Sequence, residues 1–172
     1  MQVKQSALSV TVACLMSATL LLPQTCQAQD AKVSNAMQLL ESLANKLGQP
    51  KIEGTDTVAD KRVPAIYFGS TKINNNSDLV DEVVKQAQGT ATIFVKNGGE
   101  YVRVATNVKK DDGSRAIGTI LDPKGKAIES ISKGDPFFGE VDILGKPYIA
   151  GYKPIRDSSQ QIIGIYYVGY LK

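Results

Sequence analysis

Residues 162–169 constrain the fold of this chain more than any other segment. They read Ile-Ile-Gly-Ile-Tyr-Tyr-Val-Gly and include no charged side chain. A strand with one solvent-exposed face alternates apolar and polar residues, whereas a continuous apolar run is typical of a strand buried on both faces. We therefore expect residues 161–171 to form a central strand, with a layer of side chains packed on each side of its sheet.

The remaining pattern indicates an α+β domain: one antiparallel sheet of about five strands, an N-terminal helix and flanking short helices. Apolar residues spaced three and four apart predict helices, and alternating or β-branched residues predict strands. Asn97-Gly98-Gly99 is a hairpin signal. The predicted helices are 30–48, 77–88 and 122–132, the predicted strands are 63–68, 90–96, 100–108, 137–143, 146–154 and 161–171, and residues 49–62 are predicted to be a polar connection.

The first 28 residues have the order of a secretory signal peptide. Lys4 is their one charged side chain, and an uncharged apolar or small run over 7–22 follows it. Small residues at Cys26 and Ala28 suit a signal peptidase. Because the run is shorter than the roughly 20 residues of a bilayer-spanning helix, we expect cleavage after Ala28 and a periplasmic or secreted protein. An uncleaved membrane anchor is the alternative.

The apolar stripe of the predicted helix 30–48 admits two interpretations. Val33, Met37, Leu40, Ala44 and Leu47 are spaced close to a heptad repeat. The stripe packs on the chain's own domain in the first interpretation. In the second it forms a helix–helix seam with another copy of the chain.

Composition argues against catalysis. The chain has no histidine, which excludes His-based triads, histidine zinc sites and histidine proton shuttles. Both cysteines, Cys14 and Cys26, leave with the predicted signal peptide, and no glycine-rich phosphate loop opens a helix. The 20 Lys and Arg residues nearly balance 17 Asp and Glu, without the basic stripe of a nucleic-acid-binding surface. We therefore predict no enzyme, cofactor, metal or nucleic-acid partner.

Arg103 is the first candidate ligand-binding residue. It lies in the middle of the predicted strand 100–108, on the face predicted for Tyr101, Ala105 and Asn107. A guanidinium is costly to bury unpaired, and it suits a carboxylate that accepts two parallel hydrogen bonds. Arg103 therefore either holds an anionic ligand or lies solvated or ion-paired on an exposed face.

A second group of candidates lies on the predicted strand 146–154. Lys146, Tyr148 and Tyr152 share one face with Ala150 because they are separated by even numbers of residues. Two hydroxyl groups and an ammonium in one row can line a pocket that orients a small anion. The alternative is ordinary half-buried packing. With Tyr101 and Arg103, these residues complete the predicted site.

The stretch 63–171 resembles the Cache family of extracellular sensor domains, most closely the single domain of the Cache 3/Cache 2 fusion type. The matching segments keep the family's order and spacing. They are Val63–Gly69, Gly89–Phe94, Tyr101–Val108, Asp112–Thr119, Gly145–Tyr148, Tyr152–Asp157 and Ile163–Gly169.

This resemblance implies a PAS-like fold with a ligand pocket between sheet and loops, and a role in sensing organic acids, amino acids or related metabolites in chemotaxis or signal transduction. The expected organisation is a signal peptide (1–28), an N-terminal helix and linker (29–62) and a Cache domain (63–172). No second apolar segment follows residue 171. We therefore expect a stand-alone domain that presents its ligand to a membrane receptor. The alternative is an interaction or dimerisation protein with a vestigial pocket, which docks through residues 30–48.

Overall fold

The computed structural model describes residues 24–172, with side chains from residue 30 onward. The charged, apolar and cleavage-site features of the predicted signal peptide therefore lie outside the described residues, apart from helical backbone at 24–28. Within the described part of the chain, no helix is both long and apolar enough to cross a bilayer.

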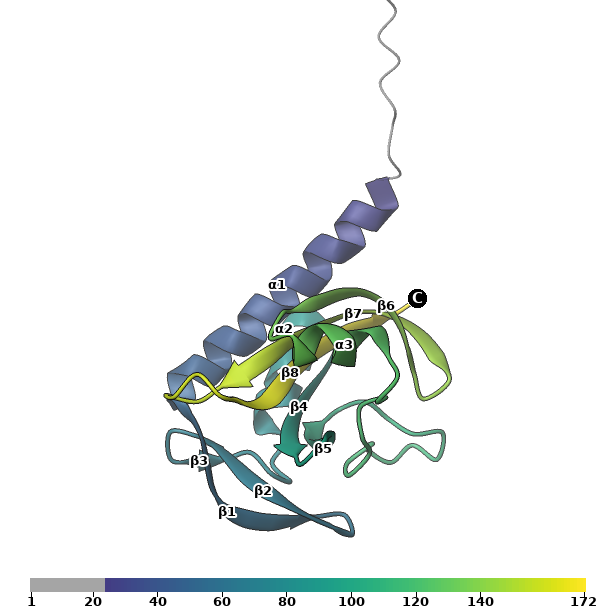
Figure 1. Ribbon diagram of the computed structural model, residues 1–172. Coiled ribbons are helices and arrows are strands. Elements are labelled where there is room, and N and C mark those ends of the chain that lie inside the picture. The colour runs from purple at the N-terminus through teal and green to yellow at the C-terminus, as the bar shows by residue number, and fades with distance from the viewer. Residues whose placement is uncertain (1–23) are drawn as a thin grey trace, which may run out of the picture.

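A five-stranded antiparallel sheet is the centre of the molecule, with strand order β5-β4-β8-β7-β6 (Figure 1). The strand predicted over 161–171 lies in the middle of this order, and its residues 163–169 are all buried. The prediction of a central strand buried on both faces is therefore confirmed. The strands are β4 (Thr90–Asn97), β5 (Glu100–Thr106), β6 (Phe137–Ile143), β7 (Lys146–Arg156) and β8 (Ile162–Leu171).

Helices cover both faces of this sheet. The long helix α1 (Gln24–Leu47) lies diagonally across one face, with α2 (Asp78–Ala87) beside it, and α3 (Lys126–Ser132) packs near β6 and β7 (Figure 1). All three helices are where the pattern predicts them, but α3 begins later than the predicted residue 122. The Asp122 carboxylate accepts a hydrogen bond from the backbone N–H of Lys124, at 2.9 Å. This bond closes a turn before the helix starts.

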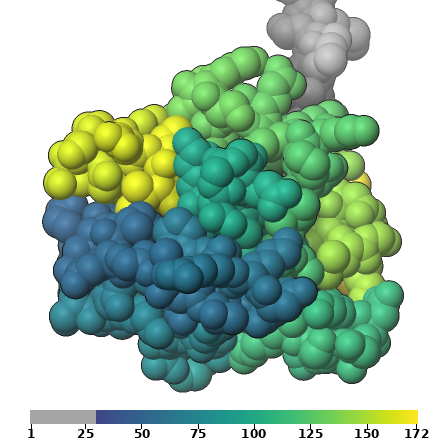
Figure 2. Space-filling view, turned by 60° about the horizontal axis from the view of Figure 1, so that its bottom comes forward, coloured from purple at the N-terminus to yellow at the C-terminus, as the bar shows by residue number. Residues whose placement is uncertain are grey.

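A second, three-stranded sheet was not predicted. It contains β1 (Pro50–Val58), β2 (Lys61–Phe68) and β3 (Thr71–Lys72), in that order. The prediction that residues 49–62 form a polar connection is therefore wrong. The predicted α+β class with a five-stranded antiparallel sheet is confirmed, and the three-stranded sheet is an addition to it. Most of β1 is exposed, so its polar side chains reflect an edge position and not a loop. Figure 2 shows the blue residues of the β1–β2 hairpin across the facing surface.

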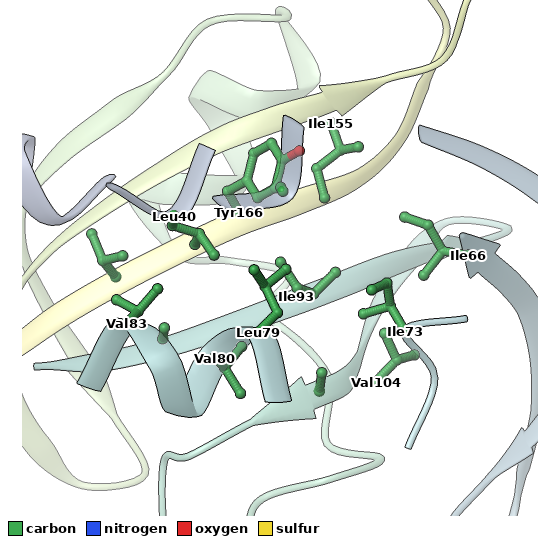
Figure 3. Close-up of a cluster of buried hydrophobic side chains, with 14 of the residues drawn as sticks. Leu40, Ile66, Ile73, Leu79, Val80, Val83, Ile93, Val104, Ile155 and Tyr166 are labelled. Atoms are coloured by element: carbon green, nitrogen blue, oxygen red, sulfur yellow. The ribbon is translucent and has the colours of Figure 1, made fainter. Parts of the chain in front are cut away.

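The larger hydrophobic core lies between the five-stranded sheet, α1, α2 and β2 (Figure 3). Val33, Met37, Leu40 and Ala44 of α1 are each at most 1% exposed in it. Own-domain packing is therefore the correct interpretation of the α1 stripe, and only Leu47 at its end is exposed. A second copy cannot use the same stripe as its seam without unpacking this core.

A β-bulge changes which residues of β5 share a face. The register between β4 and β5 shifts between Ile93 and Phe94, so that Arg103 pairs with Phe94 but Ala105 pairs with Ile93. Ala105 consequently packs in the larger core, and the Asn107 amide donates a hydrogen bond to the Val80 carbonyl of α2. The prediction that Ala105 and Asn107 share the face of Arg103 is wrong, because one extra residue reverses the alternation.

Replacement of Leu40 by Ala tests the packing of α1 on the sheet. The side chain is fully buried, and such truncations cost about 2–5 kcal/mol in lost transfer free energy and cavity formation. We expect urea unfolding to report a loss in this range. Exposed Gln38 on the same helix is the matched control, and Gln38→Ala should change stability by no more than about 0.5 kcal/mol. Equal effects of the two substitutions would contradict the packing of the stripe.

Candidate functional site

A cavity of about 420 Å³ opens on the sheet face opposite α1. Its volume is within the range of roughly 300–1,000 Å³ typical of small-molecule sites. Five parts of the chain build its walls: β5, the segment 120–125, the start of α3, β6 with its turn, and β7. The lining residues are Arg103, Ile120, Leu121, Asp122, Gly125, Lys126, Ala127, Glu140, Val141, Asp142, Ile143, Leu144 and Tyr152.

Arg103 is the buried charged group of this cavity. It is only 4% exposed, and its guanidinium lies 5.0 Å from the centre of the Phe94 ring, within the range of a cation–π interaction. Nη1 donates a 2.6 Å hydrogen bond to the Thr119 hydroxyl, which in turn donates to the Ala116 carbonyl at 2.8 Å. The guanidinium is thus held from one side by a neutral hydroxyl.

The segment that carries Thr119 is tied to Arg103 through the backbone as well. The Arg103 N–H donates to the Thr119 carbonyl, and the Gly118 N–H donates to the Arg103 carbonyl, both at 2.9 Å. Gly118 has a φ of +79°, and an added Cβ would lie 2.7 Å from the Cβ of Ala59. Glycine is therefore needed for both the turn and the close approach. It lets the 118–121 segment pair with the outer edge of β5 and form one wall of the cavity.

No described carboxylate pairs with Arg103. Its Nε is buried and has no hydrogen-bond partner in the described part of the chain. Burial lowers the pKa of the guanidinium from its ordinary value, and the phenols of Tyr152 and Tyr167 oppose this effect. An arginine nevertheless keeps its proton in proteins. The inner end of the cavity therefore holds a positive charge that the described chain does not neutralise.

Tyr152 forms the neighbouring wall. It is 2% exposed and stacks at a tilt on Tyr167, with ring centres 5.0 Å apart. Burial raises the pKa of Tyr152, with Arg103 acting in the opposite direction. Burial also raises the pKa of Tyr167, whose hydroxyl lies 3.0 Å from that of Thr90. Both phenols are therefore neutral at physiological pH, and the Tyr152 hydroxyl is a hydrogen-bond donor beside the guanidinium.

The structure brings together some of the predicted site residues and separates others. Arg103 and Tyr152 line the same cavity. Tyr101 is buried in the same hydrophobic cluster as Tyr152, behind the lining. Tyr148 shares the face of Tyr152, as predicted, but lines a different hollow near Lys32 and Gly169. Lys146 is exposed at the end of β7 and forms a 3.2 Å ion pair with Asp111.

Sequence reasoning missed most of the cavity's walls. Leu121, Ala127 and Ile143 come from a turn, a short helix and an edge strand, and each is also part of the second hydrophobic cluster. Only their apolar character marks them in the sequence, and it does not distinguish a cavity wall from ordinary core. Thr119 also has no local signal, because its role depends on the pairing of its segment with β5.

The described residues of this site do not form a metal centre. In the described residues, no group of three or more His, Cys, Asp or Glu side chains is arranged to hold a metal ion. The arrangement instead combines one buried cation, one neutral phenol and apolar walls. Its chemistry suits the binding of a small organic anion.

Comparison with curated proteins gives one short match. The chain is 34% identical over 74 residues to the ATP-dependent protease ATPase subunit HslU of Ligilactobacillus salivarius, a match that covers 43% of this chain and 15% of that protein. The chain thus spans a small part of this relative. The glycine-rich phosphate loop of P-loop nucleotide sites has no match in the sequence.

Two solved structures are similar in outline. The ligand-binding domain of the Campylobacter jejuni chemoreceptor Tlp3 in complex with L-valine aligns with a TM-score of 0.42 and 15% identity, over 86% of this chain and 60% of that one. The sensory domain of the same chemoreceptor (CcmL) aligns with a TM-score of 0.41 and 14% identity, over 86% and 61%.

The match to a family model extends much further along the chain. The model of the Cache 3/Cache 2 fusion domain matches residues 2–172. This range includes both sheets, all three helices and the cavity around Arg103. The chain therefore belongs to the Cache 3/Cache 2 fusion domain family.

Proposed function

We propose that this protein is a periplasmic or secreted ligand-binding domain that holds a small anionic metabolite in the Arg103 cavity. Cache domains are sensory ligand-binding domains and not enzymes, so the proposal concerns what is bound and how. The observation that carries it is the buried guanidinium of Arg103, which has a free Nε and no described carboxylate partner.

The energetics favour an anion at this position. Burying a charged group without a counter-charge is costly, and hydrogen bonds to charged groups contribute about 1.5–3 kcal/mol each. A ligand carboxylate at the inner end of the cavity would offset the charge. The Tyr152 phenol, which is neutral, can donate to the carboxylate oxygen atoms. The Thr119 hydroxyl accepts a hydrogen bond from Nη1. This bond fixes the orientation of the guanidinium plane toward a ligand.

The proposal also includes export of the protein and contact with a membrane partner. The signal-like order of residues 1–28 supports export, and a domain of this family in the periplasm would present its ligand to a membrane receptor or transporter. The stripe of α1 is already buried, so a receptor would meet another surface of the domain.

Thermal unfolding with candidate anions tests ligand binding. A ligand at 100 times its dissociation constant stabilises the folded protein by about 2.7 kcal/mol. We expect at least one small carboxylate to raise the melting temperature of the wild type and not that of Arg103→Met. Lys146→Met removes an exposed cation outside the cavity and should behave like the wild type. Absence of any stabilising anion would refute the proposed function.

Substitution of Thr119 tests its role as a positioning residue for Arg103. Thr119→Val removes the hydroxyl that accepts from Nη1, whereas Thr119→Ser keeps it. We expect the valine variant to bind the anion about tenfold more weakly, as expected for one lost hydrogen bond to a charged group, and the serine variant to bind like the wild type. Titration calorimetry measures both constants. Equal weakening in both folded variants would contradict this role.

Mass spectrometry of the protein exported by a bacterial host tests the processing. Cleavage after Ala28 gives an N-terminal Gln29. It removes the start of α1, which begins at Gln24, and keeps the part of the helix that contains the buried Val33. We expect this species in the periplasmic fraction. A full-length chain in the membrane fraction would instead support the uncleaved anchor.

A further inference from the structure

Three of the four edge strands of the two sheets are protected against pairing with another chain. An edge strand presents unpaired backbone N–H and C=O groups, and proteins block such edges with short strands, prolines, bulges or covering segments. β3 has only two residues, and β1 begins at Pro50 and has a register shift between Ile52 and Thr55. The outer edge of β5 is paired with the 118–121 segment.

β6 has none of these protections. It is the last strand of the five-stranded sheet (Figure 1). Its seven residues include no proline or lysine, and it pairs with β7 in one unbroken register. In the described part of the chain, no backbone hydrogen bond outside the sheet ladder involves residues 137–143. The outer edge of β6 is therefore free to accept another strand.

The residues of β6 that direct their backbone groups outward follow from the pairing of β7. The Lys172 N–H donates to the Pro147 carbonyl at 3.0 Å, so the backbone of Pro147 faces β8. Asp142, which lies opposite Pro147 on the other side of β7, consequently has its N–H and C=O directed away from β7. Because this direction alternates along a strand, the same holds for Glu140 and Phe138.

The side chains of these three residues lie on the α1 side of the sheet. A Cβ on Gly151 would meet both the Phe138 ring and Val33 of α1, and Glu140 and Asp142 share this face because they follow Phe138 at even spacing. All three are exposed, and the Phe138 side chain is 44% exposed. The free edge thus combines unpaired backbone groups with one apolar and two acidic side chains.

A second copy of the chain fits this edge poorly. The antiparallel register that pairs all three free residues with those of a second copy places Glu140 opposite Glu140 and Phe138 opposite Asp142. Like charges directly opposite each other destabilise a strand pair. A strand with basic side chains at alternate positions instead places a cation opposite each carboxylate. Lys172, which now pairs with Glu140, is exposed, and such surface ion pairs contribute little.

We infer that the outer edge of β6 binds an extended segment of a partner protein as a sixth strand, with basic side chains opposite Glu140 and Asp142 and an apolar one opposite Phe138. The free N–H and C=O groups of these residues bind the backbone of the segment, and their side chains determine which segment is accepted. The inference goes beyond the proposed function and does not depend on anion binding at Arg103.

A seven-residue peptide tests this edge by titration calorimetry with the purified protein. Acetyl-Thr-Lys-Thr-Lys-Thr-Ile-Thr-amide, running antiparallel to β6, places its lysines opposite Asp142 and Glu140 and its isoleucine opposite Phe138. We expect it to bind about tenfold more tightly than the same peptide with glutamate in place of both lysines, because attraction at two cross-strand pairs becomes repulsion.

Two N-methylated forms of this peptide separate strand pairing from charge attraction. The N–H groups of the lysines and the isoleucine face β6 in the proposed pairing, so methylation of these three nitrogen atoms should abolish measurable binding. The N–H groups of the two threonines between them face solvent. Methylation of those two should therefore leave the affinity within about twofold of that of the parent peptide, since it removes no proposed hydrogen bond.

Substitutions of Glu140 test the same pairing from the side of the protein. Glu140→Pro removes an N–H that faces solvent, a position where an edge strand tolerates proline, and should weaken binding of the lysine peptide at least tenfold. Glu140→Gln keeps the N–H and should weaken it about threefold. Glu129→Gln, at an exposed carboxylate of α3, is the control and should bind like the wild type.

Three results would overturn the inference. The first is the absence of saturable binding of the lysine peptide at millimolar concentration. The second is equal affinity of the two N-methylated peptides, which would show charge attraction without strand pairing. The third is dimerisation of the wild type in sedimentation that Glu140→Pro abolishes, because the occupant of the edge would then be a second copy. None of these results bears on anion binding in the Arg103 cavity.

Discussion

Burial of the five-stranded sheet on both faces is the constraint on which the rest of the structure depends. β8 can be apolar over 163–169 only because both faces of the sheet are covered. On one face lie α1, α2 and β2, and on the other lies the hydrophobic cluster around the Arg103 cavity. Close approach of the backbones is part of this arrangement: a Cβ on Gly164 would collide with the carbonyl oxygen of Phe94 in β4. Glycine at this position therefore lets β8 lie close to β4 within the sheet.

The two faces are used differently. On the α1 side, Leu40, Ile66 and Ile93 meet in one buried cluster (Figure 3). A hollow of about 410 Å³ that α1 and α2 line on this side has no buried charged residue in its lining. On the other side, the wall consists of a turn, a short helix and an edge strand. The Arg103 cavity lies in the space that these irregular elements leave between them. It is therefore on the side where the covering layer is irregular.

The sequence predicts the parts of this fold that a regular apolar pattern determines. The central strand, all three helices and the sharing of one face by Tyr148 and Tyr152 follow from spacing alone. It does not predict β1, because an exposed edge strand has the composition of a loop. It also fails beyond Arg103, where a β-bulge shifts the register of β5 by one residue. A bulge is fixed by pairing across the sheet, and no local residue pattern marks it here.

The same limit applies to the candidate site. Arg103 stands out in the sequence because it lies in the middle of a predicted strand between uncharged neighbours, but Lys146 has similar chemistry and lies in an exposed ion pair. What distinguishes them is burial, which depends on how the 118–121 segment closes over the edge of β5. Residue type thus identifies groups able to bind an anion. Only the tertiary structure shows which of them is buried without a carboxylate partner in the described chain.

β7 connects the cavity to the helix on the opposite face. Tyr152 faces the cavity, and the next residue, Lys153, points to the other side because side chains alternate along a strand. There its ammonium donates to both carboxylate oxygens of Glu41 in α1, at 3.0 and 3.1 Å. This pair is partly buried, so it is less screened than a surface ion pair. A displacement of the β7 backbone at Tyr152 would therefore act directly on α1, through one peptide unit and one bidentate contact.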